Sequence, residues 1–135
     1  MTLHEFLALP HRFRWGGSSG DDCTMFCASW VEELTGTDPA ADIRGTYRDA
    51  AGAHRIIDAA GGLVQFARGR LEPLGFVPTD APVDGDLGVV RAPAGMGDGM
   101  TLVSAIRFGP LWAILAPAGV IARKLEHVAA WRLKR

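Results

Sequence analysis

The stretch WGGSSGDDCTMFCASW, residues 15–30, joins a glycine–serine loop to a strongly patterned segment. Asp22 is a favourable N-cap residue, because its carboxylate can accept hydrogen bonds from unpaired backbone N–H groups of a first helical turn. Apolar residues then follow at 23, 26, 27, 30, 31 and 34, which is the spacing of one helix face. Thr35 and Gly36 mark the expected end. The pattern predicts a helix from Cys23 to Thr35 with a buried stripe.

Cys23 stands in the first turn of this helix, and two interpretations fit the position. The positive end of the helix macrodipole and the unpaired N–H groups there favour a thiolate, which is the nucleophilic form of cysteine. Alternatively, Cys23 is a small apolar residue that begins the buried stripe. The spacing alone favours packing.

The rest of the first half is also predicted to be helical. Thr2 and Glu5 have the spacing of a capping box, and we expect a short helix from there to about Leu9, before Pro10. The pair Asp38–Pro39 is typical of the start of a short helical piece. Two further helices are expected over residues 48–60 and, with a weaker pattern, 63–70.

The second half has the pattern of strands. After Pro73, glycine and proline separate short apolar runs at residues 85–90, 101–108, 111–116, 119–125 and 127–133. Helices followed by strands favour an α+β fold, with the N-terminal helices packed on a C-terminal antiparallel sheet. With 135 residues, the chain fits a single domain over 1–135.

Composition excludes several classes of function. The net charge of −1 argues against a nucleic-acid partner, and no apolar run approaches the roughly 18 residues of a membrane span. The N-terminus does not resemble a signal peptide, so we expect folding in a cytoplasm. Cys23 and Cys27 lie four positions apart on a helix, which suits neither a disulfide nor a zinc site, and we expect no metal or cofactor. The glycine-rich loop 92–99 lacks the Lys-Ser/Thr of a phosphate-binding loop.

The run FRWGGSSGDDCTMFCASWVEELTG resembles the signature of the NlpC-type cell-wall peptidases, a papain-like family. The matching residues are Trp15, Gly16, Gly17, Asp22, Cys23, Phe26, Val31 and Gly36, and the later GDLGVV resembles the first strand of that family. The resemblance implies a papain-like fold and cleavage of peptide bonds in peptidoglycan stems. It also implies that Cys23 is the nucleophile, with a histidine as base and a third polar residue to orient that histidine.

The chain departs from this family at the base. The histidine position falls at about Leu102, and the third polar position falls near Trp112 to Ile114, all of which are apolar. Leucine cannot accept a proton, and general acid–base help is worth about 10²–10⁴-fold in rate. His4, His11, His54 and His127 all lie at other positions. A surface or capping role is the simpler interpretation of each.

The chain also resembles a short papain-like branch encoded among phage and prophage tail genes, which often lacks the histidine. The residues that carry this resemblance are Leu34, Thr35, Gly36, Asp38, Pro39, Arg44, Gly45, Thr46, Tyr47, Ala130, Trp131 and Arg132. It implies a tail-tip or hub component that is made in the bacterial cytoplasm and assembled into a virion tail beside other tail proteins. Two hypotheses follow. Either the fold is kept as an assembly module, which the leucine at 102 favours, or Cys23 still cleaves peptidoglycan.

Four residues are expected at the site. Cys23 is the candidate nucleophile, while Trp15, Asp22 and Leu102 are expected to line a groove for substrate or partner. For Trp15, a groove wall and a packing role are equally supported.

Other polar and aromatic residues have structural interpretations. Arg44 is expected to pair with Asp38 or Asp42, with Tyr47 packed nearby, rather than to line the groove. Asp86 is expected to bind backbone N–H groups at a strand start. Trp30, Trp112 and Trp131 are predicted to be core residues.

Overall fold

The computed structural model describes residues 1–93 and 100–134 of the chain. The helices come first, as four α-helices and one short 3-10 helix: α1 (Leu3–Ala8), α2 (Cys23–Thr35), α3 (Ala50–Ala59), α4 (Leu63–Leu71) and η1 (Glu72–Leu74). The strands follow: β1 (Phe76–Pro78), β2 (Leu87–Pro93), β3 (Met100–Phe108), β4 (Leu111–Ala116), β5 (Gly119–Arg123) and β6 (His127–Leu133).

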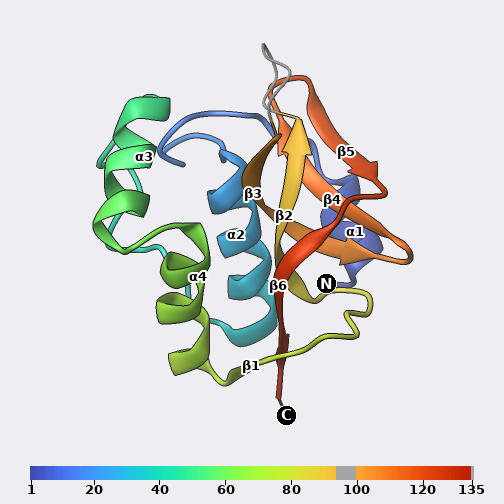
Figure 1. The fold of residues 1–135 in the computed structure, drawn as a ribbon. Helices are drawn as coiled ribbons and strands as arrows, with labels where there is room; N and C mark the ends of the chain where they lie inside the picture. The colour runs from blue at the N-terminus through green and yellow to red at the C-terminus, as the bar shows by residue number, and fades with distance from the viewer. Residues whose placement is uncertain (94–99, 135) are drawn as a thin grey trace.

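The strands form one sheet in the order β1-β6-β2-β3-β4-β5, and every pairing is antiparallel. Figure 1 shows α2, α3 and α4 on one side of this sheet. Helix α1 contributes Phe6 to the same core cluster as Phe26 and Trp30 of α2. The predicted α+β architecture, with N-terminal helices packed on a C-terminal antiparallel sheet, is therefore confirmed.

Helix α2 lies against the centre of the sheet, and its caps match the sequence pattern. The Asp22 side chain accepts a hydrogen bond from the Met25 N–H, and Gly36 closes the helix with a φ of 79°. Phe26, Trp30 and Val31 are buried in one core cluster with sheet residues such as Val89 and Ile106. Burial of each such side chain is worth about 1.5–3 kcal/mol, so this stripe anchors the residues at the start of α2.

A second, smaller cluster covers the opposite face of the sheet. Val89 packs in the first cluster and its neighbour Val90 in the second, because successive strand residues point to opposite faces. Trp112 belongs to the second cluster and lies over Gly88, where an added Cβ would come within 2.6 Å of the indole ring. The apolar run at 87–90 is continuous because both faces of the sheet are covered.

Several predicted element boundaries need correction. Strand β2 runs over Leu87–Pro93 rather than residues 85–90. Residues 39–45 form consecutive turns rather than the short helix expected after Asp38–Pro39, and the Ala40 carbonyl accepts the N–H groups of both Ile43 and Arg44. Helix α3 begins at Ala50, since Asp49 caps it. Strand β5 ends at Arg123 rather than residue 125. Strand β1, at Phe76–Pro78, was not predicted, because its three residues carry no alternation.

Within the described ranges, none of the helices has both the length and the apolar character needed to cross a bilayer.

Candidate functional site

A groove of about 700 Å³ lies where the start of α2, the preceding loop, α3 and the ends of β3 and β4 meet. Its wall includes Trp15, Asp22, Cys23 and Leu102, the four residues that the sequence assigned to a site. The structure therefore brings together residues that are separated by 87 positions between Trp15 and Leu102. Most of the remaining wall is apolar, with side chains from α3, β4 and β5.

Asp22 holds the loop and the helix start in one arrangement. Its side chain is 1% exposed, and Oδ1 accepts the Met25 N–H at 2.9 Å. Oδ2 accepts the Gly16 N–H at 3.2 Å and the Tyr47 hydroxyl at 2.5 Å. Asp22 is thus a positioning residue for the groove as well as an N-cap.

Cys23 is partly buried and packs against the smaller core cluster, which contains Ala92 and Ile114. Burial raises the pKa of the Cys23 thiol, and the nearby negative charge of Asp22 raises it further. Hydrogen bonds from Thr24 and from the Ser104 backbone act in the opposite direction but are outweighed. Of the two interpretations of Cys23, the direction of its pKa favours a packed thiol over a thiolate, because the thiol is desolvated beside a carboxylate.

The two strands facing Cys23 carry apolar side chains where the resemblance places a base and its orienting residue. Leu102 on β3 is 37% exposed and lines the groove, and Ile114 on β4 is buried in its wall. Trp112 is fully buried in the smaller core, not in the groove. The polar side chain nearest in sequence to Leu102 on the same strand face is Ser104, whose Oγ lies 3.2 Å from Thr24 Oγ1.

Three of the four histidines do not line the groove. His4 stacks edge-on against Phe108, His11 Nε2 lies 2.6 Å from the Phe6 carbonyl oxygen, and His127 lies against Trp112.

His54, on α3, is the histidine that lines the groove. One face of α3 is turned toward the groove and carries Ala50, Ala53, His54 and Ile57. Their i, i+3, i+4, i+7 spacing could have indicated from the sequence that His54 shares a face with apolar residues.

Arg44 joins the turn region to α2. Its Nε donates to Asp38 Oδ2 at 2.6 Å, and one terminal nitrogen donates to Asp21 Oδ1 at 2.9 Å. The expected pairing with Asp38 is confirmed, whereas Asp42 pairs with Arg70 instead. The contact with Asp21 was missed, because the 23-residue separation leaves no local pattern.

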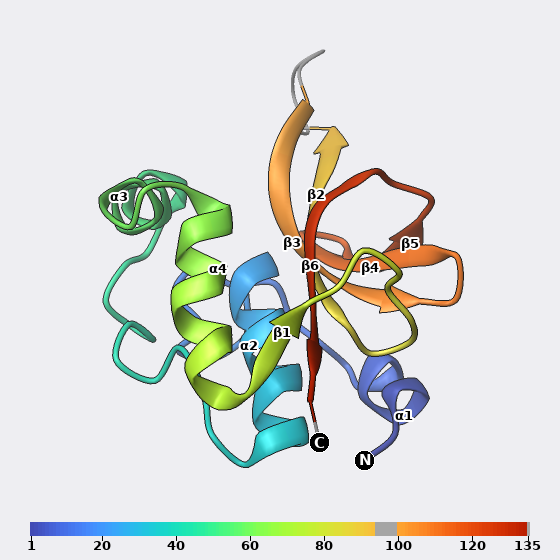
Figure 2. The same ribbon diagram turned by 60° about the horizontal axis from the view of Figure 1, so that its bottom comes forward.

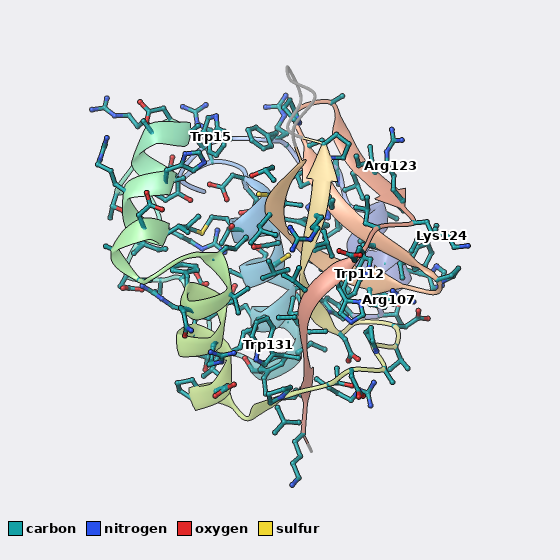
Figure 3. All side chains as sticks on the ribbon, viewed as in Figure 1. Trp15, Arg107, Trp112, Arg123, Lys124 and Trp131 are labelled. Carbon is teal, nitrogen blue, oxygen red and sulfur yellow. The ribbon has the colours of Figure 1, made fainter. Side chains whose placement is uncertain are left out.

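The structure also places the four tryptophans and Asp86. Trp15 packs edge-on against Phe13 with ring centres 5.1 Å apart and forms part of the groove wall, near α3 in Figure 3. Trp30, Trp112 and Trp131 are core residues as predicted. Asp86 accepts the Val83 N–H and pairs with Arg132, so its expected binding of backbone N–H is confirmed.

Most of the glycine-rich loop 92–99, judged unsuited to phosphate, lies outside the described residues. In residues 1–93 and 100–134, no three His, Cys, Asp or Glu side chains gather closely enough to bind a metal ion.

Comparison with known proteins identifies a family without a known activity. A family profile described as a domain of unknown function, DUF6950, matches residues 2–133. Because the match covers nearly the whole chain, the chain belongs to this family. No curated protein and no solved structure matches it.

Proposed function

We propose that this DUF6950 chain is a tail-tip or hub component of a phage-type particle, built on an NlpC-like papain fold and without efficient peptidase activity. Cys23 opens α2 in the wall of a groove, in the place that the NlpC resemblance gives to a nucleophile. Leu102 stands on β3 in the same groove, where that resemblance requires a histidine. The presence of both Cys23 and Leu102 in the wall of this groove is the observation that carries the proposal.

The environment of Cys23 supports weak rather than efficient catalysis. The raised pKa leaves little thiolate near neutral pH. The apolar wall from β3 and β4 also provides no acid to protonate a leaving amine. Both effects act against the same acylation step, since that step needs an ionised sulfur and a proton donor.

The tail assignment rests on the resemblance of the turn region and of the chain end to a phage-tail branch. In the structure these residues form stabilising contacts. Arg44 links the turns to α2, and Trp131 and Arg132 on β6 are fixed by packing and by Asp86. In this proposal the chain folds in the bacterial cytoplasm and leaves the cell only as part of a tail, in contact with other tail-tip or hub proteins.

The experiment is to isolate particles from a bacterium that carries this coding sequence and to search them for the chain by mass spectrometry. We expect the chain at a fixed copy number in intact tails, and particles with Cys23→Ser that infect as well as the parent. Absence of the chain from purified particles would overturn the tail assignment. A large infectivity loss in Cys23→Ser particles of normal appearance would overturn the inactive reading.

The second candidate function is an active cysteine peptidase that cleaves peptidoglycan stem peptides during wall penetration. His54 favours it, because this histidine lines, from α3, the same groove that Cys23 lines from α2. In that case Cys23 attacks the amide carbonyl, the amine leaves with a proton, and water hydrolyses the thioester. Release of muropeptides from host peptidoglycan, lost in both Cys23→Ser and His54→Gln, would support it. No release by particle or purified chain would exclude it.

A further inference from the structure

Strand β3 is paired unequally on its two sides. On one side it pairs with β2 in seven consecutive positions, from Ile106 with Leu87 to Met100 with Pro93. On the other side it pairs with β4 through only three positions, Ile106, Arg107 and Phe108. Within the described part of the chain, residues 101–105 therefore have no strand beside them on the β4 side. In Figure 2 the ends of β2 and β3 project beyond the rest of the sheet.

The backbone alternation shows which groups face this open side. In an antiparallel strand, alternate residues direct their N–H and C=O groups to opposite neighbours. The Arg107 N–H donates to the Asp86 carbonyl on the β2 side at 2.8 Å. Leu102 and Ser104 differ from Arg107 by odd numbers of residues, so their backbone groups point away from β2. The hydrogen bond between the Ser104 backbone and the Cys23 thiol agrees with this direction.

The open edge lies inside the groove rather than on a flat surface. Thr101, Leu102 and Val103 form one wall, and Ile114 and Ile121 from the diverging β4–β5 hairpin belong to another. A volume of about 700 Å³ falls within the roughly 300–1,000 Å³ of pockets that enclose a drug-sized ligand. The backbone groups of Leu102, which no described strand pairs on this side, lie between apolar walls. They suit an extended peptide, because main-chain pairing gives affinity and side-chain pockets give specificity.

The charges of the groove indicate which side chains such a peptide should carry. The Asp22 carboxylate in the wall is already bonded to three donors. Arg123 is exposed and, within the described residues, forms no ion pair. Figure 3 shows Arg123 on β5 and Trp15 near α3, on either side of the β2–β3 end. A carboxylate on the peptide is therefore expected at the β5 end.

We propose that this groove binds an extended segment of a partner protein, which pairs as an added strand with the open edge of β3 at Leu102. Its alternate side chains are apolar and occupy the groove walls, and an acidic residue at one end reaches Arg123. The segment passes beside Cys23, and no covalent step is involved. This binding role holds whether or not the chain is a tail component.

The test uses a display library of random peptides, selected on the purified chain and counter-selected on Leu102→Glu. We expect enriched peptides with alternating apolar residues and a terminal acid. When synthesised, they should bind Leu102→Glu at least about tenfold more weakly, because a carboxylate then replaces an apolar wall. Val77→Glu is the matched control, since Val77 has similar exposure, 40%, but lies on β1 at the far edge of the sheet. It should bind normally.

Two measurements separate strand addition from simple apolar binding. Methylation of the backbone nitrogen at alternate peptide residues, whose N–H groups face β3, should abolish binding. Methylation at the residues between them should have little effect. Bound peptide should also slow amide hydrogen exchange at Leu102 but not at Val77. Arg123→Glu should shift the selected terminal residue from acidic to basic. Enrichment of no peptide, equal binding by Leu102→Glu, or equal tolerance of N-methylation at every position would each overturn the proposal.

Discussion

The Tyr47 hydroxyl donates a 2.5 Å hydrogen bond to the buried carboxylate of Asp22, across 25 residues of sequence. The same carboxylate oxygen accepts the Gly16 N–H, so one side chain joins the loop, the start of α2 and the segment before α3. Removal of Tyr47 would leave a buried charge with fewer donors, which is costly because water cannot replace them. The arrangement of the groove therefore depends on this contact.

We predict that Tyr47→Phe lowers the free energy of unfolding by about 1.5–3 kcal/mol, the usual worth of a hydrogen bond to a charged group. Urea denaturation measures the change. Asp22→Asn should cost more, because it also weakens the cap, and the double variant should show coupling above about 0.5 kcal/mol. Thr46→Val, which loses a hydrogen bond between its exposed hydroxyl and the Ile43 carbonyl, is the control. Additive effects of Tyr47→Phe and Asp22→Asn would contradict the arrangement.

Gly16 provides a second prediction about the same loop. Its φ is 89°, and an added Cβ would lie 2.1 Å from the Tyr47 carbonyl oxygen. Gly109 also has a positive φ, 57°, but nothing lies within 4 Å of its Cβ position. We expect Gly109→Ala to cost about 1–2 kcal/mol from backbone strain alone. Gly16→Ala should cost about 1–3 kcal/mol more from the clash, as measured by urea denaturation. If Gly16→Ala and Gly109→Ala lowered the free energy of unfolding equally, the loop at Gly16 would have moved to relieve the clash at no energetic cost.

The sequence predicted those features that depend on local spacing. The α2 stripe, the Thr2–Glu5 capping box and the glycine end of α2 were all readable, because each involves residues within a few positions. Leu102 and Cys23 were placed in one groove only through the resemblance, since helix and strand periodicity say nothing about which ends meet.

Other features could not be predicted, because they depend on distant residues. The Asp21–Arg44 and Asp22–Tyr47 contacts join positions that no period connects. The raised pKa of Cys23 likewise depends on burial against β3, which outweighs the local effect of the helix start. Strand β3 is paired unequally because β4 diverges from it after three positions. The sequence of β4 is an unbroken apolar run, which does not indicate where the two strands separate.

Arg44 allows a test of the link between the turn region and α2. We predict that Arg44→Met lowers the free energy of unfolding by about 2–3 kcal/mol, because the carboxylates of Asp21 and Asp38 then lack their common partner while partly buried. Arg91→Met is the control, since its pair with Glu126 is exposed and such pairs are worth about 0–1 kcal/mol. Similar losses for the two variants, measured by urea denaturation, would mean that the link contributes little.

The reactivity of Cys23 toward iodoacetamide tests the electrostatics of the groove. Only the thiolate reacts, so the labelling rate follows the ionised fraction. Burial and Asp22 raise the pKa, which shifts ionisation to higher pH. We therefore predict that Cys23 in the folded chain is labelled with a midpoint above about 8.5, the value of a free thiol. Mass spectrometry of the modified peptides measures it. Cys27 should react more slowly, because it is buried and its pKa is raised further.

Asp22→Asn separates the charge effect from burial. Loss of the carboxylate removes the second cause of the shift, so the Cys23 midpoint should move down, toward the free value. Asp21→Asn is the matched control, because the neighbouring Asp21 contributes to the raised pKa of Cys27 but not to that of Cys23. Labelling in urea, where both thiols are solvated, gives the common reference. A folded-state midpoint well below 8.5 for the parent chain would mean that the helix start dominates, and Cys23 would then be an activated nucleophile whose base should be sought first at His54.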